Sequence, residues 1–325
     1  MAQTFRELIA ENKRNSVLLV VAFCLFITVL AMVLALGLLA YSGANLSRLS
    51  LLEGVVMGVV AGVISLLLSV IGYYAGNDMV LAISGAQPIR HEDDPELFNV
   101  VEEMAIAAGI PMPRVYLIHD SAPNAMATGR DPEHAVVAIT TGLRSKLTRD
   151  ELQGVIAHEV SHVRNYDIRL MLLLAVLVGS VVMLCDFFWQ ILRWGPRGSS
   201  RKSDKDGGGG VIFLIILVVA VILAILAPLL AQLIQLAVSR QREYLADASA
   251  VELTRYPQGL ASALKKIDAD PADLQNANRG TAHLYIANPI KKFEARAHTA
   301  FASHPPIQDR IRRLEALVHQ EGARP

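Results

Sequence analysis

Two histidines and one glutamate are spaced so that they could bind a metal ion and use it. His158 and His162 stand four positions apart in the sequence HEVSH, and Glu159 follows the first of them. On a helix, positions i and i+4 share one face, so the two imidazoles can bind one ion. The carboxylate at position 159 would then lie where a general base acts on water. The pattern favours a zinc peptidase, and the alternative is a packed histidine pair on an amphipathic helix.

The flanking sequence places this motif on a helix. Residues 148–151 (TRDE) have the form of a capping box, which predicts a helix start at this point. Leu152, Val155 and Ile156 supply an apolar face, and no proline or glycine occurs between positions 155 and 178. We therefore expect HEVSH to lie on a helix, as the metal chemistry requires.

Four long apolar segments dominate the composition, which is 53% hydrophobic with a mean hydropathy of +0.40. They cover residues 17–41, 51–76, 170–194 and 211–238. Because about 20 helical residues cross the hydrocarbon core of a bilayer, each is long enough to span it. The first segment is longer than the core of a signal peptide, which favours a retained span. The lipid bilayer is therefore an expected partner.

Charge and cysteine content exclude other classes of protein. The formal net charge is zero and no basic stripe is present, so no nucleic-acid partner is expected. Cys24 and Cys185 both lie inside apolar segments, which excludes a disulfide framework and a cysteine zinc site.

The positive-inside rule gives the orientation. Arg6, Lys13 and Arg14 precede the first apolar segment and place the N-terminus in the cytoplasm. Two spans return residues 77–168 to that side, and two more return the C-terminal region. The third loop opposes this orientation because it contains several basic residues, namely Arg193, Arg197, Arg201, Lys202 and Lys205. The alternative is that the third and fourth segments form a hairpin that does not cross fully.

The expected fold class is an α-helical membrane protein with a mainly α, α+β zincin-like catalytic domain that carries a small β-sheet. A helix is expected over 94–108 and strands over 114–119, 124–128 and 135–140. The third and fourth apolar helices split the catalytic domain. The domain boundaries are an N-terminal part with two membrane helices at 1–76, a first catalytic half at 77–168, two membrane helices at 169–238 with a flexible loop over 195–210, and a second catalytic half at 239–325.

A catalytic zinc ion usually has three protein ligands, so one more ligand is needed. The candidates are His283, His298, His304, Glu243, Asp247 and Glu252. If the third and fourth apolar segments form an antiparallel hairpin, His162 lies ~12 Å and Glu243 ~7.5 Å from its end at 1.5 Å per helical residue. This spacing favours Glu243, and Asp247, one turn further, could orient a ligand histidine. The alternative is that both carboxylates pair with Arg240 or Arg242 on a solvated helix face.

Four sequence segments together resemble a known family. HEVSH at 158–162 is followed by SRQREYLAD at 239–247, with NAMATG at 124–129 and SHPP at 303–306. This set resembles the HtpX-type membrane zinc metallopeptidases, which are related to CAAX prenyl proteases and mitochondrial Oma-type proteases. The resemblance covers nearly the whole chain, including the order of the apolar segments.

The resemblance implies an endopeptidase of a bacterial-type inner membrane, with both termini and the active site facing the cytoplasm. Its substrates would be unfolded, damaged or misfolded membrane proteins, and its role protein quality control. One zinc ion per chain would be held by His158, His162 and Glu243, with Glu159 as the base.

The resemblance also assigns residues around the metal. Asn124, Ala125, Met126 and Ala127 would form an edge strand that pairs with extended substrate backbone. The family often has phenylalanine at position 126, and methionine can fill the same pocket. His304 and Arg310 would stabilise the oxyanion or hold the core.

Three rival functions remain open at this point. An intramembrane site-2-type protease would place HExxH inside the bilayer. A CAAX prenyl protease shares the motifs but is expected to have more apolar segments. A membrane scaffold with a structural metal would not need Glu159. Oligomeric state does not follow from the sequence.

Overall fold

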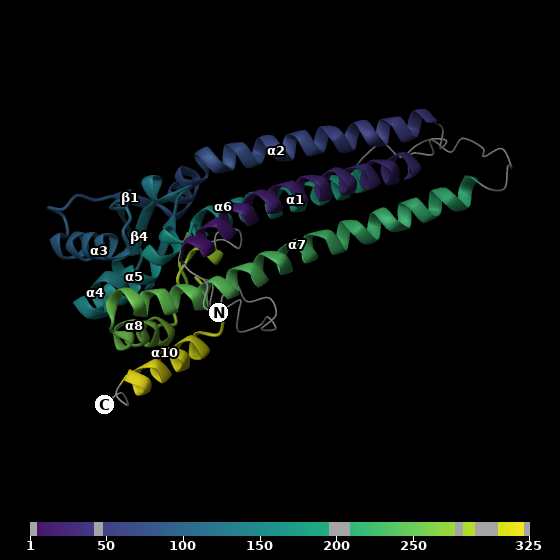
Figure 1. Ribbon diagram of the computed structural model, residues 1–325. Coiled ribbons are helices and arrows are strands. Elements are labelled where there is room, and N and C mark those ends of the chain that lie inside the picture. Colours follow the sequence, from purple (N-terminus) through teal and green to yellow (C-terminus); the bar gives the residue numbers. More distant parts are fainter. Residues whose placement is uncertain (1–4, 42–47, 195–208, 277–281, 290–304, 322–325) are drawn as a thin grey trace. The chain divides into compact units, whose positions relative to one another are not determined.

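The computed structural model describes residues 5–41, 48–194, 209–276, 282–289 and 305–321 (Figure 1). The chain forms two compact units. The first unit comprises 1–16, 72–175 and 235–325, and the second comprises 17–71 and 176–234. His298, His304 and most of the loop expected over 195–210 lie outside the described residues.

Long helices account for the second unit. They are α1 (Phe5–Tyr41), α2 (Arg48–Ser84), α6 (Asp167–Trp194) and α7 (Gly209–Thr254), and parts of them belong to the first unit. Each contains a candidate membrane span, over 16–41, 51–84, 167–194 and 214–234, which matches the four predicted apolar segments. α7 starts at Gly209, two residues before the expected start of the fourth apolar segment at position 211.

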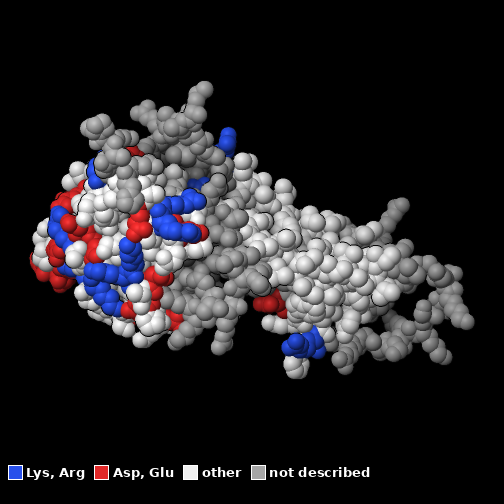
Figure 2. All heavy atoms as spheres, turned by 90° about the horizontal axis from the view of Figure 1, so that it is seen from below, with Lys and Arg blue, Asp and Glu red and all other residues white. Residues whose placement is uncertain are grey.

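The outer surface of these helices is apolar. Large aliphatic side chains on α2 and α7 are exposed, for example Leu52 at 58% and Leu214 at 61%. On the face shown in Figure 2, lysine, arginine, aspartate and glutamate gather over the first unit, and the long helices show almost none. An exposed apolar surface of this extent is suited to lipid.

A four-stranded sheet lies in the first unit. Its strands are β1 (Ala86–Pro88), β2 (Arg114–Ile118), β3 (Ala125–Thr128) and β4 (Val136–Thr140), in the order β1-β2-β4-β3. β2 and β4 are parallel, whereas β1 and β3 are antiparallel to their neighbours. The structure confirms the three predicted strands and adds β1. β1 gives no sequence signal because it has three residues and ends in proline.

Helices cover this sheet and form the core with it. They are α3 (Pro95–Ala108), α5 (Arg149–Arg164), α8 (Pro257–Ala269) and α10 (Ile307–Glu321), with the shorter α4 (Thr141–Lys146), η1 (Pro132–His134) and η2 (Ala282–Leu284). α5 packs against α3 and α8, and α8 packs against α10. Asp94 caps α3, and Thr148 and Glu151 form the predicted capping box of α5.

The structure confirms that HEVSH lies on a helix, α5, but the ~12 Å estimate from His162 to the third apolar segment assumed helix throughout residues 162–170, and the chain breaks there. α5 ends at Arg164, Tyr166 adopts a left-handed φ of 62°, and α6 begins at Asp167. Neither glycine nor proline marks this break. Tertiary contacts account for it, because the turn brings the Asp167 carboxylate to His162 and Arg242.

Candidate metal centre

The structure brings His158, His162 and Glu243 together as a group that could hold a metal ion. The two Nε2 atoms are 3.3 Å apart, and the Glu243 oxygens lie 3.6 Å from Nε2 of His158 and 3.5 Å from that of His162. Ligand atoms bound to a tetrahedral zinc at 2.0–2.1 Å are about 3.3 to 3.4 Å apart. These separations, two of them from different oxygens of Glu243, are close to the zinc value, and two imidazoles with a carboxylate have the chemistry that zinc requires.

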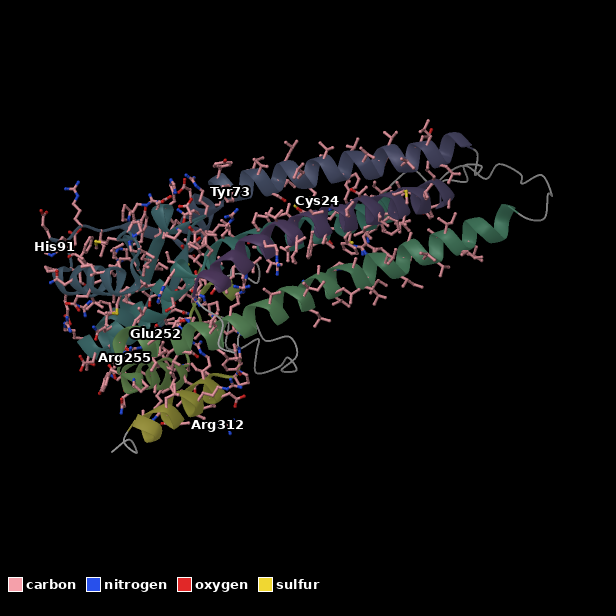
Figure 3. All side chains as sticks on the ribbon, in the orientation of Figure 1. Cys24, Tyr73, His91, Glu252, Arg255 and Arg312 are labelled. Carbon is pink, nitrogen blue, oxygen red and sulfur yellow. The ribbon has the colours of Figure 1, made fainter. Side chains whose placement is uncertain are left out.

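The other candidates for the third ligand lie elsewhere. His283 is buried, and its Nε2 atom is 3.2 Å from the Met171 carbonyl oxygen. Glu252 is on the exposed side of α7 (Figure 3). Asp247 is near the histidines but contacts Nδ1 of His158 rather than Nε2. Among the described candidates, Glu243 is thus the one that the structure groups with both histidines.

Each histidine of the group has a carboxylate on its other ring nitrogen. Asp247 Oδ1 lies 3.0 Å from Nδ1 of His158, and Asp167 Oδ2 lies 3.1 Å from Nδ1 of His162. Asp167 is fully buried and also pairs with Arg242. Such contacts fix the ring orientation and leave Nε2 available as a metal ligand. Asp247 was predicted for this role, whereas no sequence pattern points to Asp167, because it reaches His162 only through the turn at Tyr166.

Carboxylates surround the two imidazoles of the site, and this arrangement favours a cation. Burial lowers the pKa of His162, but Asp167 and Glu243 raise it to about 10. Burial alone would raise the pKa of Asp247, yet Arg310 and His158 bring it below its usual value. Carboxylates that hold a proton on a buried imidazole can instead hold a divalent ion, with release of that proton.

Glu159 lies in the same buried region. Its side chain is 1% exposed, and its Oε1 atom has no hydrogen-bond partner among the described residues. Burial raises the pKa of this carboxyl, while His158 and His162 oppose the increase. A buried carboxylate oxygen that has an open acceptor position beside candidate metal ligands can take a proton from water.

Arg310 extends from α10 to the candidate metal centre, and its side chain is buried, with 1% of its surface exposed. Its Nε and Nη2 atoms donate to the two Asp247 oxygens at 2.8 and 2.7 Å, and Nη1 donates to the Ile286 carbonyl at 2.6 Å. Nη1 is also 3.1 Å from Glu243 Oε2. The structure therefore places this predicted residue against the metal group and its supporting carboxylate.

The residues predicted to bind substrate backbone already contact another part of the chain. They are Asn124 and, in β3, Ala125 to Ala127. β3 is the last strand in the sheet order. The Ile286 N–H donates to the Ala125 carbonyl at 2.8 Å, and Asn124 Nδ2 donates to the Ala287 carbonyl at 3.0 Å. An antiparallel bridge also pairs Met126 with Tyr285.

Residues 91–318 match the model of a protein family, Peptidase family M48. The chain belongs to this family. The M48 family is zinc-dependent, and membership makes the chain a metalloprotease. The resemblance drawn from the sequence is thus confirmed at the level of the family.

Curated relatives extend the similarity beyond the M48 region. A protease HtpX homolog of Lactiplantibacillus plantarum is 44% identical over 312 residues, covering 96% of this chain and 99% of the relative. One of Thermoanaerobacter pseudethanolicus is 44% identical over 316 residues, covering 97% and 99%. With the four apolar helices, these bacterial relatives indicate a multi-pass membrane metalloprotease of the inner membrane.

Among solved structures, the chain is similar to the crystal structure of S. mikatae Ste24p. The two share 21% sequence identity with a TM-score of 0.49. The match covers 78% of this chain and 58% of the Ste24p chain.

Proposed function

We propose that this M48 protein is a zinc endopeptidase that cleaves unfolded or damaged membrane proteins in protein quality control. The observation that carries the proposal is the close grouping of the His158, His162 and Glu243 donor atoms, with the buried Glu159 carboxylate beside them. These three residues would hold one zinc ion per chain.

When bound, zinc supplies a Lewis acid that polarises the peptide carbonyl and makes a water molecule more acidic. Glu159 accepts the proton of that water as it attacks and then delivers the proton to the leaving amine. Asp247 and Asp167 keep the two imidazoles oriented through their Nδ1 atoms. Arg310 compensates the negative charge of Asp247 and Glu243.

The position of β3 supports an extended polypeptide as substrate. A strand at the end of a sheet offers its backbone groups to another peptide, so Asn124, Ala125, Met126 and Ala127 would bind backbone rather than a particular side chain. Recognition of this kind selects for unfolded segments. The four candidate spans keep the enzyme in the bilayer, where membrane proteins are its neighbours.

We also propose that the active site and both termini face the cytoplasm. Arg6, Lys13 and Arg14 before the first span favour this orientation. α5, which carries HEVSH, lies outside the four candidate spans, and this position speaks against a site-2-type intramembrane protease.

Four full-length chains in detergent test the proposal, namely wild type, Glu159→Gln, Glu243→Gln and the exposed control Glu252→Gln. Each is stripped with a chelator and reloaded with zinc, and zinc content and cleavage of unfolded casein are measured. Glu159→Gln should bind one zinc ion but lose ~10²- to 10⁴-fold in kcat. Glu243→Gln should lose zinc, and Glu252→Gln should behave as wild type. Normal turnover by Glu159→Gln would show that another group is the base.

A prenylated C-terminal peptide, assayed beside casein, separates the rival functions. Cleavage of that peptide alone would favour a CAAX prenyl protease. Stoichiometric zinc with no cleavage of either substrate would favour a scaffold with a structural metal.

A further inference from the structure

One short segment of the chain, residues 284–287, lies where the proposed substrate backbone would bind. Beside the metal centre, three groups can form hydrogen bonds with the backbone of a peptide. The Ala125 carbonyl is an acceptor, and the Asn124 amide and the Arg310 guanidinium are donors. All of these groups contact residues 286 and 287, at 2.8, 3.0 and 2.6 Å respectively.

The direction of the segment is that of a bound peptide. The Met126–Tyr285 bridge is antiparallel, so the segment adds a partial strand to the outer side of β3. Peptides that bind to a sheet edge use this type of pairing. The Ile286 carbonyl is also close to the metal group, because its partner, Arg310 Nη1, is 3.1 Å from Glu243 Oε2.

The segment is tightly packed. Leu284, Tyr285, Ile286 and Ala287 are all at most 6% exposed. It is also attached at both ends, by the His283 contact with the Met171 carbonyl and by the Leu274 N–H, which donates to the Pro289 carbonyl at 2.9 Å. A peptide must displace this segment before it can use the same backbone groups.

We propose that residues 284–287 are an internal substrate-like strand that occupies the outer edge of β3 and competes with protein substrates for it. This inference rests on the proposed function, since it concerns access to the same site. It also describes the substrate class. The segment places leucine, tyrosine and isoleucine side chains in buried positions, so this edge of β3 takes extended peptides with large apolar side chains, which unfolded membrane segments supply.

The first test weakens the segment without touching the metal centre. Ile286→Ala removes buried side-chain contacts, and Ile267→Ala in α8 makes the same change at a site that is 0% exposed. Because apparent affinity scales with the open fraction, Ile286→Ala should raise kcat/KM for casein about tenfold or more, through a lower KM. Ile267→Ala should lower stability without this gain. Equal kcat/KM values for the two variants would overturn the inference.

The second test does not depend on turnover. Hydrogen exchange is followed at residues 284–287 in zinc-loaded Glu159→Gln, with and without saturating unfolded casein, and binding is measured separately by fluorescence anisotropy. Casein that binds should speed up exchange in the segment. Bound casein with unchanged exchange would overturn the inference and leave the proposed function intact. If casein neither binds nor is cleaved by any variant, the proposed function itself fails, and this inference fails with it.

Discussion

Replacing Gly154 by alanine should loosen the contact between α5 and α8. A Cβ atom at position 154 would lie 2.5 Å from the Leu260 nitrogen and 2.9 Å from both Gly259 C and Leu260 Cα. All three are backbone atoms, so no side chain can rotate away. Since carbon contacts are normally about 3.5–4.0 Å, the two helices must separate by about 1 Å.

Two opposing terms set the size of the effect. Overpacking a well-packed core costs about 1–3 kcal/mol. Alanine in place of glycine in a helix recovers about 1 kcal/mol. We therefore expect a net loss of up to about 2 kcal/mol in the free energy of unfolding, and a stability about 1–3 kcal/mol below that of a Gly→Ala variant whose new Cβ atom meets no neighbour. Zinc affinity should fall too, because Gly154 is one turn before His158 and the displaced helix also carries His162.

Thermal unfolding of the full chain and competition with a zinc-chelating dye measure the two effects. Gly179→Ala in α6 is the matched control, because a Cβ atom there meets nothing within 4 Å. This control should be as stable as wild type or slightly more stable. If Gly154→Ala matched it in both measurements, the close approach of α5 and α8 inferred here would be wrong.

Two further predictions concern carboxylates. Asp167→Asn should weaken zinc binding by roughly 10- to 100-fold, because it loses the charge that orients His162; unchanged affinity relative to the exposed control Asp268→Asn would contradict this role. Burial raises the pKa of Asp94, but its hydrogen bonds with Arg144 lower the pKa below 3.8 overall. A carboxyl whose pKa is lowered by folding stabilises the fold at pH values above the pKa of the unfolded state. This stabilisation is lost as the pH falls through the pKa of the folded state. Wild type should therefore exceed Asp94→Asn in unfolding free energy by a constant amount above pH ~5, and the difference should shrink in more acidic buffer.

Local sequence patterns predicted the elements that position the centre. The capping box at Thr148 and Glu151 set the start of α5, and the i, i+4 spacing put His158 and His162 on one face. Glu243 could be favoured because it lies shortly after the fourth apolar segment. Its distance from that segment is similar to the distance between His162 and the third apolar segment. These predictions needed only helical geometry and segment lengths.

The remaining features depend on contacts between distant parts of the chain. The turn at Tyr166 has no glycine or proline, so only the fold shows that Asp167 returns to His162. The pairing of Ile286 with Ala125 joins residues 161 positions apart, and no periodicity reports it. Arg310 was assigned a role only through the family resemblance; composition and spacing alone would place it on the surface, because an arginine side chain is rarely buried without a partner.

Arg310 connects the metal centre to access by substrate. Its charge is buried, and a buried charge is tolerated when carboxylates and carbonyls surround it, as Asp247, Glu243 and the Ile286 carbonyl do here. Two of its donors hold the carboxylate that orients His158, while Nη1 holds the internal strand. When a substrate displaces Ile286, its own carbonyl can take the same donor, so the guanidinium remains satisfied and the ligand geometry is kept. The exchange of one peptide for another therefore costs no buried hydrogen bond at Arg310, and this makes a tightly packed internal strand compatible with turnover.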